Sequence, residues 1–254
     1  MNFRMIQKWK NSYKKWKIRK YYQDAAGELE FIKSLSKIGR GSDFINAIEL
    51  SKSQNFQDIF VLTMLDFKLE GFFVEFGALD GVSISNTFLM EKSYGWIGIL
   101  AEPSKSYHVN LKKNRDVHID FSCVWKESNQ EILFWEIPNS GLSGLPLGLQ
   151  KRSDQIKKGI KQRQEYMVKT VSLIDLLQRY NAPKKIDYLS IDTEGTELDI
   201  LQAFDFKQYQ FSVITIEHNF TNERRGQYSL LTSNGYKRVL EDVSDVDDWY
   251  ILDN

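Results

Sequence analysis

The segment FFVEFGALDG, residues 72–81, decides how the fold of this chain is interpreted. Apolar and aromatic residues surround one acid, Glu75, which is typical of a parallel strand buried on both faces. Gly77 and Gly81 then bracket a turn where the backbone can bend sharply and a ligand can approach closely. Residues 83–94 continue with helical spacing. The segment therefore predicts a strand, a glycine turn and a helix, and ligands of open α/β sheets bind where such strands end.

The glycine spacing and the acids indicate which ligand suits this turn. A dinucleotide fingerprint reads Gly-x-Gly-x-x-Gly, whereas this turn has only Gly77 and Gly81, with three residues between them. Glu75 and Asp80 would repel a pyrophosphate but suit a cationic ligand. S-adenosylmethionine carries a sulfonium and an ammonium group and no phosphate. The alternative is a purely structural turn in another kind of α/β domain.

A second apolar run, residues 96–101, ends at Glu102 and Pro103. An acid at the tip of the second strand of such a fold can accept hydrogen bonds from both hydroxyls of a ribose. Residues 117–124 are then expected to form a third strand. Ser122 and Cys123 lie near its end, where the adenine of a nucleoside would lie.

Further strands and helices alternate along the rest of the chain. Strands are expected at residues 131–137, 169–171, 186–191, 211–216, 236–243 and 248–252. The basic segment 151–164 is expected to be an exposed helix or a lid. We predict an α/β fold with a doubly wound, mostly parallel seven-stranded sheet and an antiparallel edge strand.

Acids and a histidine follow two of these strands directly. Asp192 and Glu194 follow residues 186–191, and Glu217 and His218 follow residues 211–216. Adjacent parallel strands deliver such residues to one rim, where they can bind a hard cation, act as a general base or cap helices. Glu197 suits capping. We interpret Asp192 and His218 as catalytic candidates, and Asp192, Glu217 and His218 as a candidate metal site.

The first 50 residues have a different character from the rest of the chain. Residues 1–20 contain eight Lys or Arg and no acid, so in this neutral chain residues 21–254 carry a net charge of −8. Apolar side chains in residues 1–24 recur at helical spacing beside the basic ones. This pattern is typical of a helix that lies on a membrane surface, or of one that packs on the domain or on a second subunit. Nucleic-acid binding has no further support in the sequence.

Composition limits the remaining possibilities. We expect a basic N-terminal extension over residues 1–50 and one α/β domain over residues 51–254. A single cysteine, Cys123, excludes an internal disulfide framework and suits a reducing compartment. Transmembrane and signal-peptide patterns are absent, so a cytoplasmic protein is expected.

With these segments in place, the sequence resembles the FkbM family of S-adenosylmethionine-dependent methyltransferases. The matching pieces occur in family order between residues 50 and 252. They are Ser53-Gln54-x-x-Gln57-Asp58, Val74-Glu75-Phe76-Gly77-Ala78-x-Asp80-Gly81, Ser85-Asn86-Thr87, Gly95-Trp96-x-Gly98-Ile99, Glu102-Pro103, Ser140-Gly141-Leu142 and Ile191-Asp192-Thr193-Glu194-Gly195-x-Glu197.

The resemblance implies a class I methyltransferase fold and methyl transfer to a hydroxyl oxygen, in a family that acts on sugars and on polyketide or glycolipid-like products. The residues that it implies for cofactor binding are Glu75, Gly77, Asp80, Ser85, Asn86 and Glu102. It places Asp192 at the reacting centre. The strand-end acids are also similar to the Mg²⁺ or Mn²⁺ site of cation-dependent O-methyltransferases, with His218 or Asn219 beside Glu217 in place of an Asp-Asn pair.

The acceptor and two rival functions stay open. Basic residues 151–164 and Arg224-Arg225 suggest a negatively charged acceptor such as a nucleotide-linked sugar, although arginines on a helix surface are also ordinary. A non-catalytic nucleoside-binding or membrane-associated scaffold is one rival, against which the strand-end acids argue. A nicotinamide dehydrogenase is the other, disfavoured by the missing middle glycine.

Overall fold

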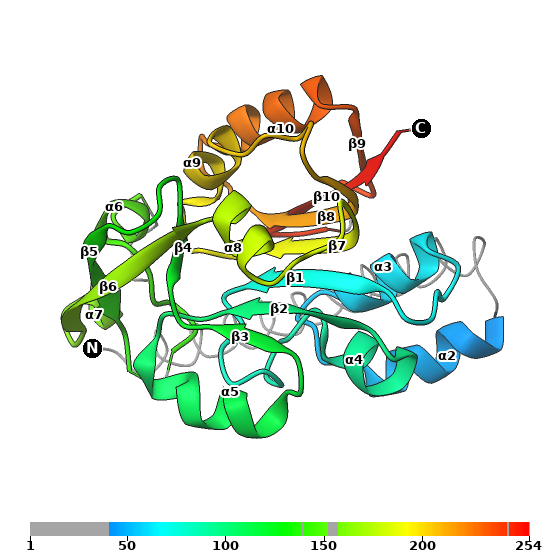
Figure 1. Ribbon diagram of the computed structural model, residues 1–254, viewed down its shortest axis with the longest axis horizontal. Coiled ribbons are helices and arrows are strands. Elements are labelled where there is room, and N and C mark those ends of the chain that lie inside the picture. Colours follow the sequence, from blue (N-terminus) through cyan, green and yellow to red (C-terminus); the bar gives the residue numbers. More distant parts are fainter. Residues whose placement is uncertain (1–40, 139, 152–156, 243, 254) are drawn as a thin grey trace, which may run out of the picture.

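A computed structural model describes residues 41–138, 140–151, 157–242 and 244–253. Its centre is a seven-stranded sheet in the order β3-β2-β1-β7-β8-β10-β9 (Figure 1). These strands are β1 (Phe72–Phe76), β2 (Ile97–Ala101), β3 (His118–Asp120), β7 (Lys185–Ile191), β8 (Gln210–Glu217), β9 (Tyr236–Val239) and β10 (Asp247–Leu252). Neighbouring strands from β3 to β8 are parallel, and β10 runs antiparallel to β8 and β9. The predicted α/β class, and the seven-stranded sheet with antiparallel pairing at one edge, are confirmed.

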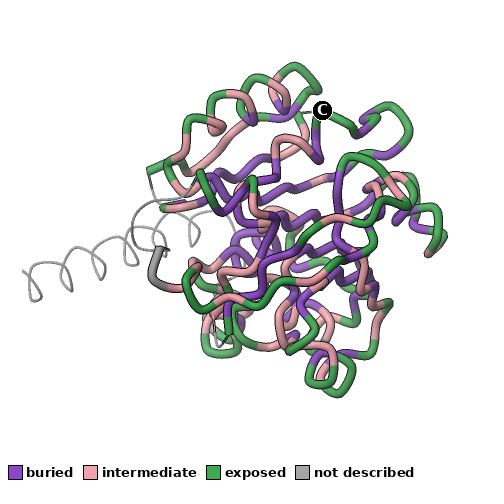
Figure 2. The backbone as a smooth tube through the Cα atoms, turned by 90° about the vertical axis from the view of Figure 1, so that its left-hand side faces the viewer, coloured by how far each residue is buried: buried purple, intermediate pink, exposed green. Residues whose placement is uncertain are grey.

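Helices cover both faces of this sheet, and the strands lie buried between them (Figure 2). One face packs against α2 (Gly41–Leu50), α3 (Gln57–Met64), α4 (Phe88–Tyr94) and α5 (His108–Asn114), which follows the short η1 (Lys105–Tyr107). The other packs against α8 (Leu173–Arg179), α9 (Glu197–Gln202) and α10 (Arg224–Ser233). Within the described residues, no helix is long and apolar enough to span a membrane.

Strand β1 shows why its sequence is apolar without alternation. Phe72, Val74 and Phe76 pack in the core beneath α8, α9 and α10, whereas Phe73 packs in the core beneath α3 and α4. Successive side chains of a strand point to opposite faces, so a strand covered on both sides needs apolar residues at every position. Glu75 is the exception, and it points to the same face as Phe73.

The expected third strand, residues 117–124, is instead divided between two sheets. Strand β3 ends at Asp120, whose carboxylate accepts a 2.8 Å hydrogen bond from the backbone N–H of Ser122 and contacts Arg179. These two contacts of Asp120 hold the turn by which the chain leaves the first sheet. Strand β4 (Cys123–Trp125) then joins a second, three-stranded sheet with β5 (Glu131–Glu136) and β6 (Gln164–Ser172). β6 is much longer than the extended piece expected at residues 169–171.

The segment between β5 and β6 contains two short helices, α6 (Pro146–Leu149) and α7 (Lys157–Ile160). The basic lid expected over residues 151–164 is therefore described only in part. The basic N-terminal helix expected within residues 1–24 lies outside the described residues.

The order of the strands fixes where a ligand can bind. From β1 the chain builds β2 and β3 on one side, and later β7 and β8 on the other. Loops that leave the carboxyl ends of β1 and β7 therefore diverge and open a crevice at this rim.

Candidate functional site

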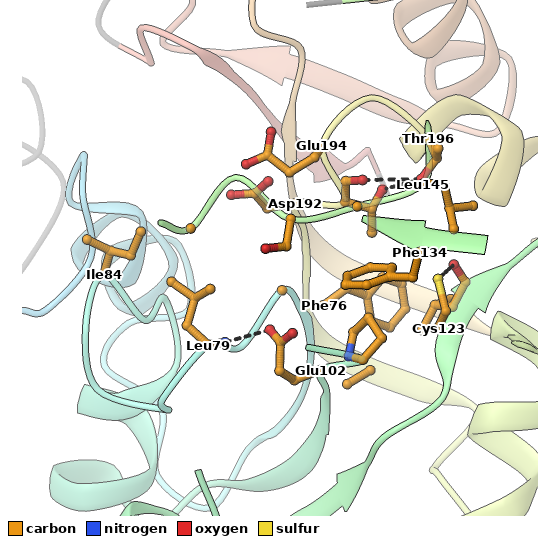
Figure 3. Close-up of a pocket in the computed structure, with 18 residues that line it drawn as sticks. Phe76, Leu79, Ile84, Glu102, Cys123, Phe134, Leu145, Asp192, Glu194 and Thr196 are labelled. Atoms are coloured by element: carbon orange, nitrogen blue, oxygen red, sulfur yellow. Dashed lines mark hydrogen bonds between the residues drawn. The ribbon is translucent and has the colours of Figure 1, made fainter. Parts of the chain in front are cut away.

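A pocket with an empty volume of about 620 Å³ lies at the carboxyl ends of β1, β2 and β7 (Figure 3). Its walls come from the turn after β1, the loops after β2 and β7, and the second sheet with the segment that follows β5. Of the residues proposed from sequence, Gly77, Glu102, Cys123 and Asp192 line it. Sequence segments far apart in the chain thus meet where the strand order predicts a ligand.

Gly77 lets the turn after β1 pack against the end of β7. Its φ angle is 74°, in the left-handed region that favours glycine. A Cβ atom at this position would lie 2.4 Å from the carbonyl oxygen of Asp192, which is far inside van der Waals contact. The two strand ends can approach this closely because Gly77 has no side chain.

Glu102 directly follows β2, at the floor of the pocket, and is 3% exposed. One carboxylate oxygen accepts the N–H of Leu79 at 2.8 Å and the other accepts the N–H of Ser104 at 2.7 Å. Burial raises the pKa of Glu102 to about 7, the two N–H donors oppose this, and the charges of Glu136 and Asp192 add to it. Each oxygen keeps a further lone pair with which it can accept a ligand hydroxyl.

One wall of the pocket is apolar. Cys123, Val124 and Phe134 line it, and all three are buried. Ser122 does not line the pocket; its N–H holds Asp120 instead. Asp120 was missed by sequence reasoning, although an acid closing the third strand is a signal of the same kind as Glu102.

Glu75, which we expected to hold the cofactor, is hydrogen-bonded within its own loop and does not line the pocket. Its carboxylate accepts hydrogen bonds from Thr87 Oγ1 at 2.6 Å, from the N–H of Asn86 at 2.7 Å and from Ser85 Oγ at 3.1 Å. Arg115, whose side chain is fully buried, lies 3.7 Å away. Burial raises the pKa of Glu75 more than Arg115 lowers it. Ser85 and Asn86 thus hold Glu75, and neither they nor Glu75 line the pocket.

The loop that Glu75 holds explains two further differences from expectation. The helix expected from residue 83 starts only at Phe88, since residues 83–87 are folded around the carboxylate. Asp80 likewise serves its own turn, because it accepts the N–H groups of Val82 and Ser83 at 2.9 and 2.7 Å. The loop in turn places Ile84, with a φ of 50°, at the pocket wall (Figure 3).

Three acids meet beside the pocket. Asp192, Glu194 and Glu217 each offer a carboxylate oxygen within 4.8 Å of those of the other two. We call these residues the acid trio. Convergence of Asp192 and Glu217 agrees with the expectation from sequence, and Glu194 is the third member in place of His218. The loop that carries Glu194 is folded around Glu197, which accepts the N–H groups of Thr193 and Gly195 at 3.0 and 2.9 Å.

Asp247 adds a fourth acid next to the trio. It lies opposite Glu217 in the pairing of β8 with β10. Burial raises the pKa of Asp247 to about 7, a 2.6 Å hydrogen bond from the amide of Gln57 opposes this, and the charge of Asp192 adds to it. Sequence reasoning missed this residue because antiparallel pairing of β10 brings it to the rim.

His218 faces away from the acid trio. Its Nδ1 accepts the N–H of Phe220 at 3.0 Å, and its Nε2 lies 3.7 Å from Asp248 Oδ1. Burial lowers the pKa of His218, although Asp248 opposes this. The Phe220 N–H therefore already occupies Nδ1. Neighbouring residues of a strand point to opposite faces, which is why Glu217 and His218 do not share a site.

Comparison with known proteins now identifies the family. A model of the methyltransferase FkbM domain matches residues 75–250. The chain belongs to the FkbM methyltransferase family. The resemblance seen in the sequence is therefore confirmed, and the chain is a methyltransferase by family.

Three solved structures that are similar to this FkbM chain are distant from it in sequence. A precorrin-6y C5,15-methyltransferase from Geobacter metallireducens GS-15 is 13% identical over 75% of each chain, with a TM-score of 0.38. A methyltransferase FkbM from Methylobacillus flagellatus KT is 9% identical over 82% of this chain and 57% of its own, with a TM-score of 0.45. A fibrillarin/Nop5p complex is 12% identical over 76% of this chain and 79% of its own, with a TM-score of 0.35. No curated protein sequence matches the chain.

Proposed function

We propose that this chain is an S-adenosylmethionine-dependent O-methyltransferase that modifies a hydroxyl of a sugar or glycan precursor. The observation that carries the proposal is a pocket with Glu102 at its floor and the acid trio at its rim. The residues that we assign to a nucleoside and the carboxylates that we assign to activation of a hydroxyl are thus side by side.

The residues present fit the nucleoside part of the cofactor. Glu102 can accept hydrogen bonds from ribose hydroxyls, since each of its oxygens accepts one backbone N–H and keeps a further lone pair. Cys123, Val124 and Phe134 offer a buried apolar wall for a planar base. When bound, S-adenosylmethionine supplies a methyl group on a positively charged sulfur, which makes that methyl open to attack by an oxygen.

In this proposal the chain contributes positioning and removal of a proton. Asp192 lines the pocket and belongs to the acid trio, so it is placed to take the proton of an acceptor hydroxyl. The pocket walls hold the hydroxyl in line with the methyl group, which removes much of the entropic cost of the reaction. We assign this role to Asp192 and not to His218, because the Nδ1 of His218 already accepts the N–H of Phe220.

We also propose that the acid trio holds a divalent cation. Three carboxylates close together repel one another, and oxygen ligands are those that Mg²⁺ and Mn²⁺ prefer. Asp192, Glu194 and Glu217 would hold the ion, and it would lower the pKa of an acceptor hydroxyl.

The cofactor assignment predicts that Glu102→Gln weakens binding of S-adenosylmethionine about tenfold to a hundredfold, as expected for hydrogen bonds to a charged group. Calorimetry with the purified protein measures this, with NAD as the rival ligand. The exposed Glu127→Gln is the matched control and should bind like wild type. Tighter binding of NAD, or unchanged affinity in folded Glu102→Gln, would remove the assignment.

The raised pKa of Glu102 adds a pH signature to this measurement. Ribose hydroxyls that donate to Glu102 favour its ionised form, so binding requires loss of the proton that the buried carboxyl retains below about pH 7. Affinity is expected to rise roughly tenfold between about pH 6 and about pH 8, and then to level off. A flat profile for wild type over this range would contradict the role of Glu102.

The cation assignment predicts that exhaustive chelation lowers methyl transfer at least about tenfold, and that Mg²⁺ or Mn²⁺ restores it. Binding of Mn²⁺ alone, followed by electron paramagnetic resonance, should be lost in Glu194→Gln and retained in Glu127→Gln. Full activity after chelation would exclude the cation and leave Asp192 as the base.

A further inference from the structure

A second hollow is lined by residues of the loop before α10, of α10 itself and of β9 and the turn after it. Figure 1 shows where α10 and β9 lie in the fold. The empty volume of the hollow is about 1020 Å³, and three arginines line it, namely Arg224, Arg225 and Arg238. Thr221, Asn222 and Tyr228 add a hydroxyl, an amide and a phenol. We call this the arginine hollow. The proposed function above does not use it.

A buried carboxylate fixes two of the three arginines. Asp248 is fully buried and accepts two hydrogen bonds from Arg224, at 3.0 and 2.7 Å, and one from Arg238, at 3.3 Å. Arg238 also contacts Glu241, and its guanidinium lies 4.6 Å from the ring centre of Tyr228. The side chains of Arg224 and Arg238 are nevertheless 31% and 21% exposed. Two guanidinium groups are therefore held in place while part of each faces solvent, as in sites that bind anions through arginine.

The third arginine leaves the arginine hollow with a surplus of positive charge. Arg225 is exposed and, among the described residues, forms no salt bridge. Three guanidinium groups thus face two carboxylates, those of Asp248 and Glu241. Arg225 has no carboxylate partner among the described residues, so an anion that enters the hollow can be bound by it as well as by Arg224 and Arg238.

The arginine hollow is linked to the acid trio. Lys151 Nζ donates to the carbonyl oxygen of Gly195 at 3.2 Å and binds the carboxylate of Glu223. Gly195 directly follows Glu194 of the trio, and Glu223 directly precedes Arg224. Thr221, which lines the hollow, also donates through its hydroxyl to the carbonyl oxygen of His218, next to Glu217. The two sites are thus on adjoining loops, with negative charge at one and positive charge at the other.

We infer that the arginine hollow binds a phosphate group of the acceptor. The inference rests on the proposed function, because it assumes that the acceptor hydroxyl lies at the acid trio. The opposite charges orient such a molecule: its phosphate is repelled by the acids and held by the arginines, and its hydroxyl is left toward Asp192. The substrate class is therefore a phosphorylated sugar or a sugar linked to a nucleotide.

Titration of the whole chain with inorganic pyrophosphate tests the hollow without methyl transfer. We expect saturable binding that Arg225→Gln weakens about tenfold or more, since it removes one guanidinium–phosphate contact. Arg225 is exposed, so the variant should fold, which circular dichroism and thermal unfolding verify. Lys113→Gln, which removes an exposed charge from α5, should leave the affinity unchanged. Absent binding, or equal affinity in Arg225→Gln, overturns the inference.

A set of acceptors then tests whether this phosphate belongs to the substrate. Glucose, glucose 1-phosphate and uridine diphosphate glucose are incubated with S-adenosylmethionine, and methylated products are detected by mass spectrometry. Methylation of either phosphorylated compound, with a KM raised by Arg225→Gln and an unchanged kcat, supports the inference and shows which source of phosphate is used. Methylation of glucose alone overturns it and leaves the proposed function intact. If no compound is methylated and S-adenosylmethionine does not bind, the proposed function fails, and the pyrophosphate titration still decides the hollow.

Discussion

Replacing Asp192 with asparagine is expected to lower the rate of methyl transfer by about a hundredfold or more, the range for loss of a general base. Asparagine keeps the size of the side chain but neither takes a proton nor carries the charge that a cation needs. Because Glu102 and the apolar wall remain, binding of S-adenosylmethionine should be retained. Transfer of a radiolabelled methyl group to the acceptor gives the rate, and calorimetry gives the affinity.

The Asp192 experiment has a control and a companion. Asp205→Asn removes an exposed carboxylate far from the rim in sequence and should have the wild-type rate. Glu194→Gln should resemble Asp192→Asn, since the two acids belong to one trio. A rate in Asp192→Asn within about threefold of wild type, with the protein folded, would show that the acid trio takes no part in the chemistry.

The second large effect concerns stability and not catalysis. Glu75→Ala is expected to lower the free energy of unfolding by about 3–5 kcal/mol, the cost of removing one partner of a buried ion pair. The loop at residues 83–87 would lose its acceptor, and Arg115 would keep a buried charge with less compensation. Denaturant unfolding followed by fluorescence gives the change.

Two comparisons make the Glu75 prediction specific. The exposed Glu131→Ala should leave the free energy of unfolding within about 0.5 kcal/mol of wild type. Our expectation would be contradicted if Glu75→Ala kept the free energy of unfolding of wild type and lost binding of S-adenosylmethionine. That result would show that Glu75 contacts the cofactor, as the family resemblance implies, and that its hydrogen bonds to the loop contribute little.

Much of the fold follows from local patterns in the sequence. β1, β2, β7 and β8 are short apolar runs that end at glycine or an acid, and such runs specify buried parallel strands. The division of residues 117–124 has no such signal. It depends on Asp120, whose contact with Arg179 joins residues 59 positions apart. A turn that is fixed by a partner so distant in sequence cannot be found from its own residues.

The candidate site was predictable where a residue ends a strand and points into the crevice, as Glu102 and Asp192 do. Two kinds of information were missing for the rest. One is direction: Glu217 and His218 are adjacent in sequence, but the strand sends their side chains to opposite faces. The other is the hydrogen-bond partner inside the protein. Glu75 and Asp80 are acids beside a turn, but backbone N–H groups of their own loops already donate to them. Sequence shows that a carboxylate is available and not which donor it binds.

Cys123, which lines the apolar wall of the pocket, can be used to measure how often this wall opens. It is the single cysteine of the sequence, it is 6% exposed, and burial raises the pKa of its thiol to about 12. At neutral pH the thiol is protonated and shielded, so an alkylating reagent can react with it only while the wall is displaced. The rate of alkylation, measured as one mass increment on the intact chain, therefore reports how often the pocket wall opens. A nucleoside bound against the wall would lower this rate.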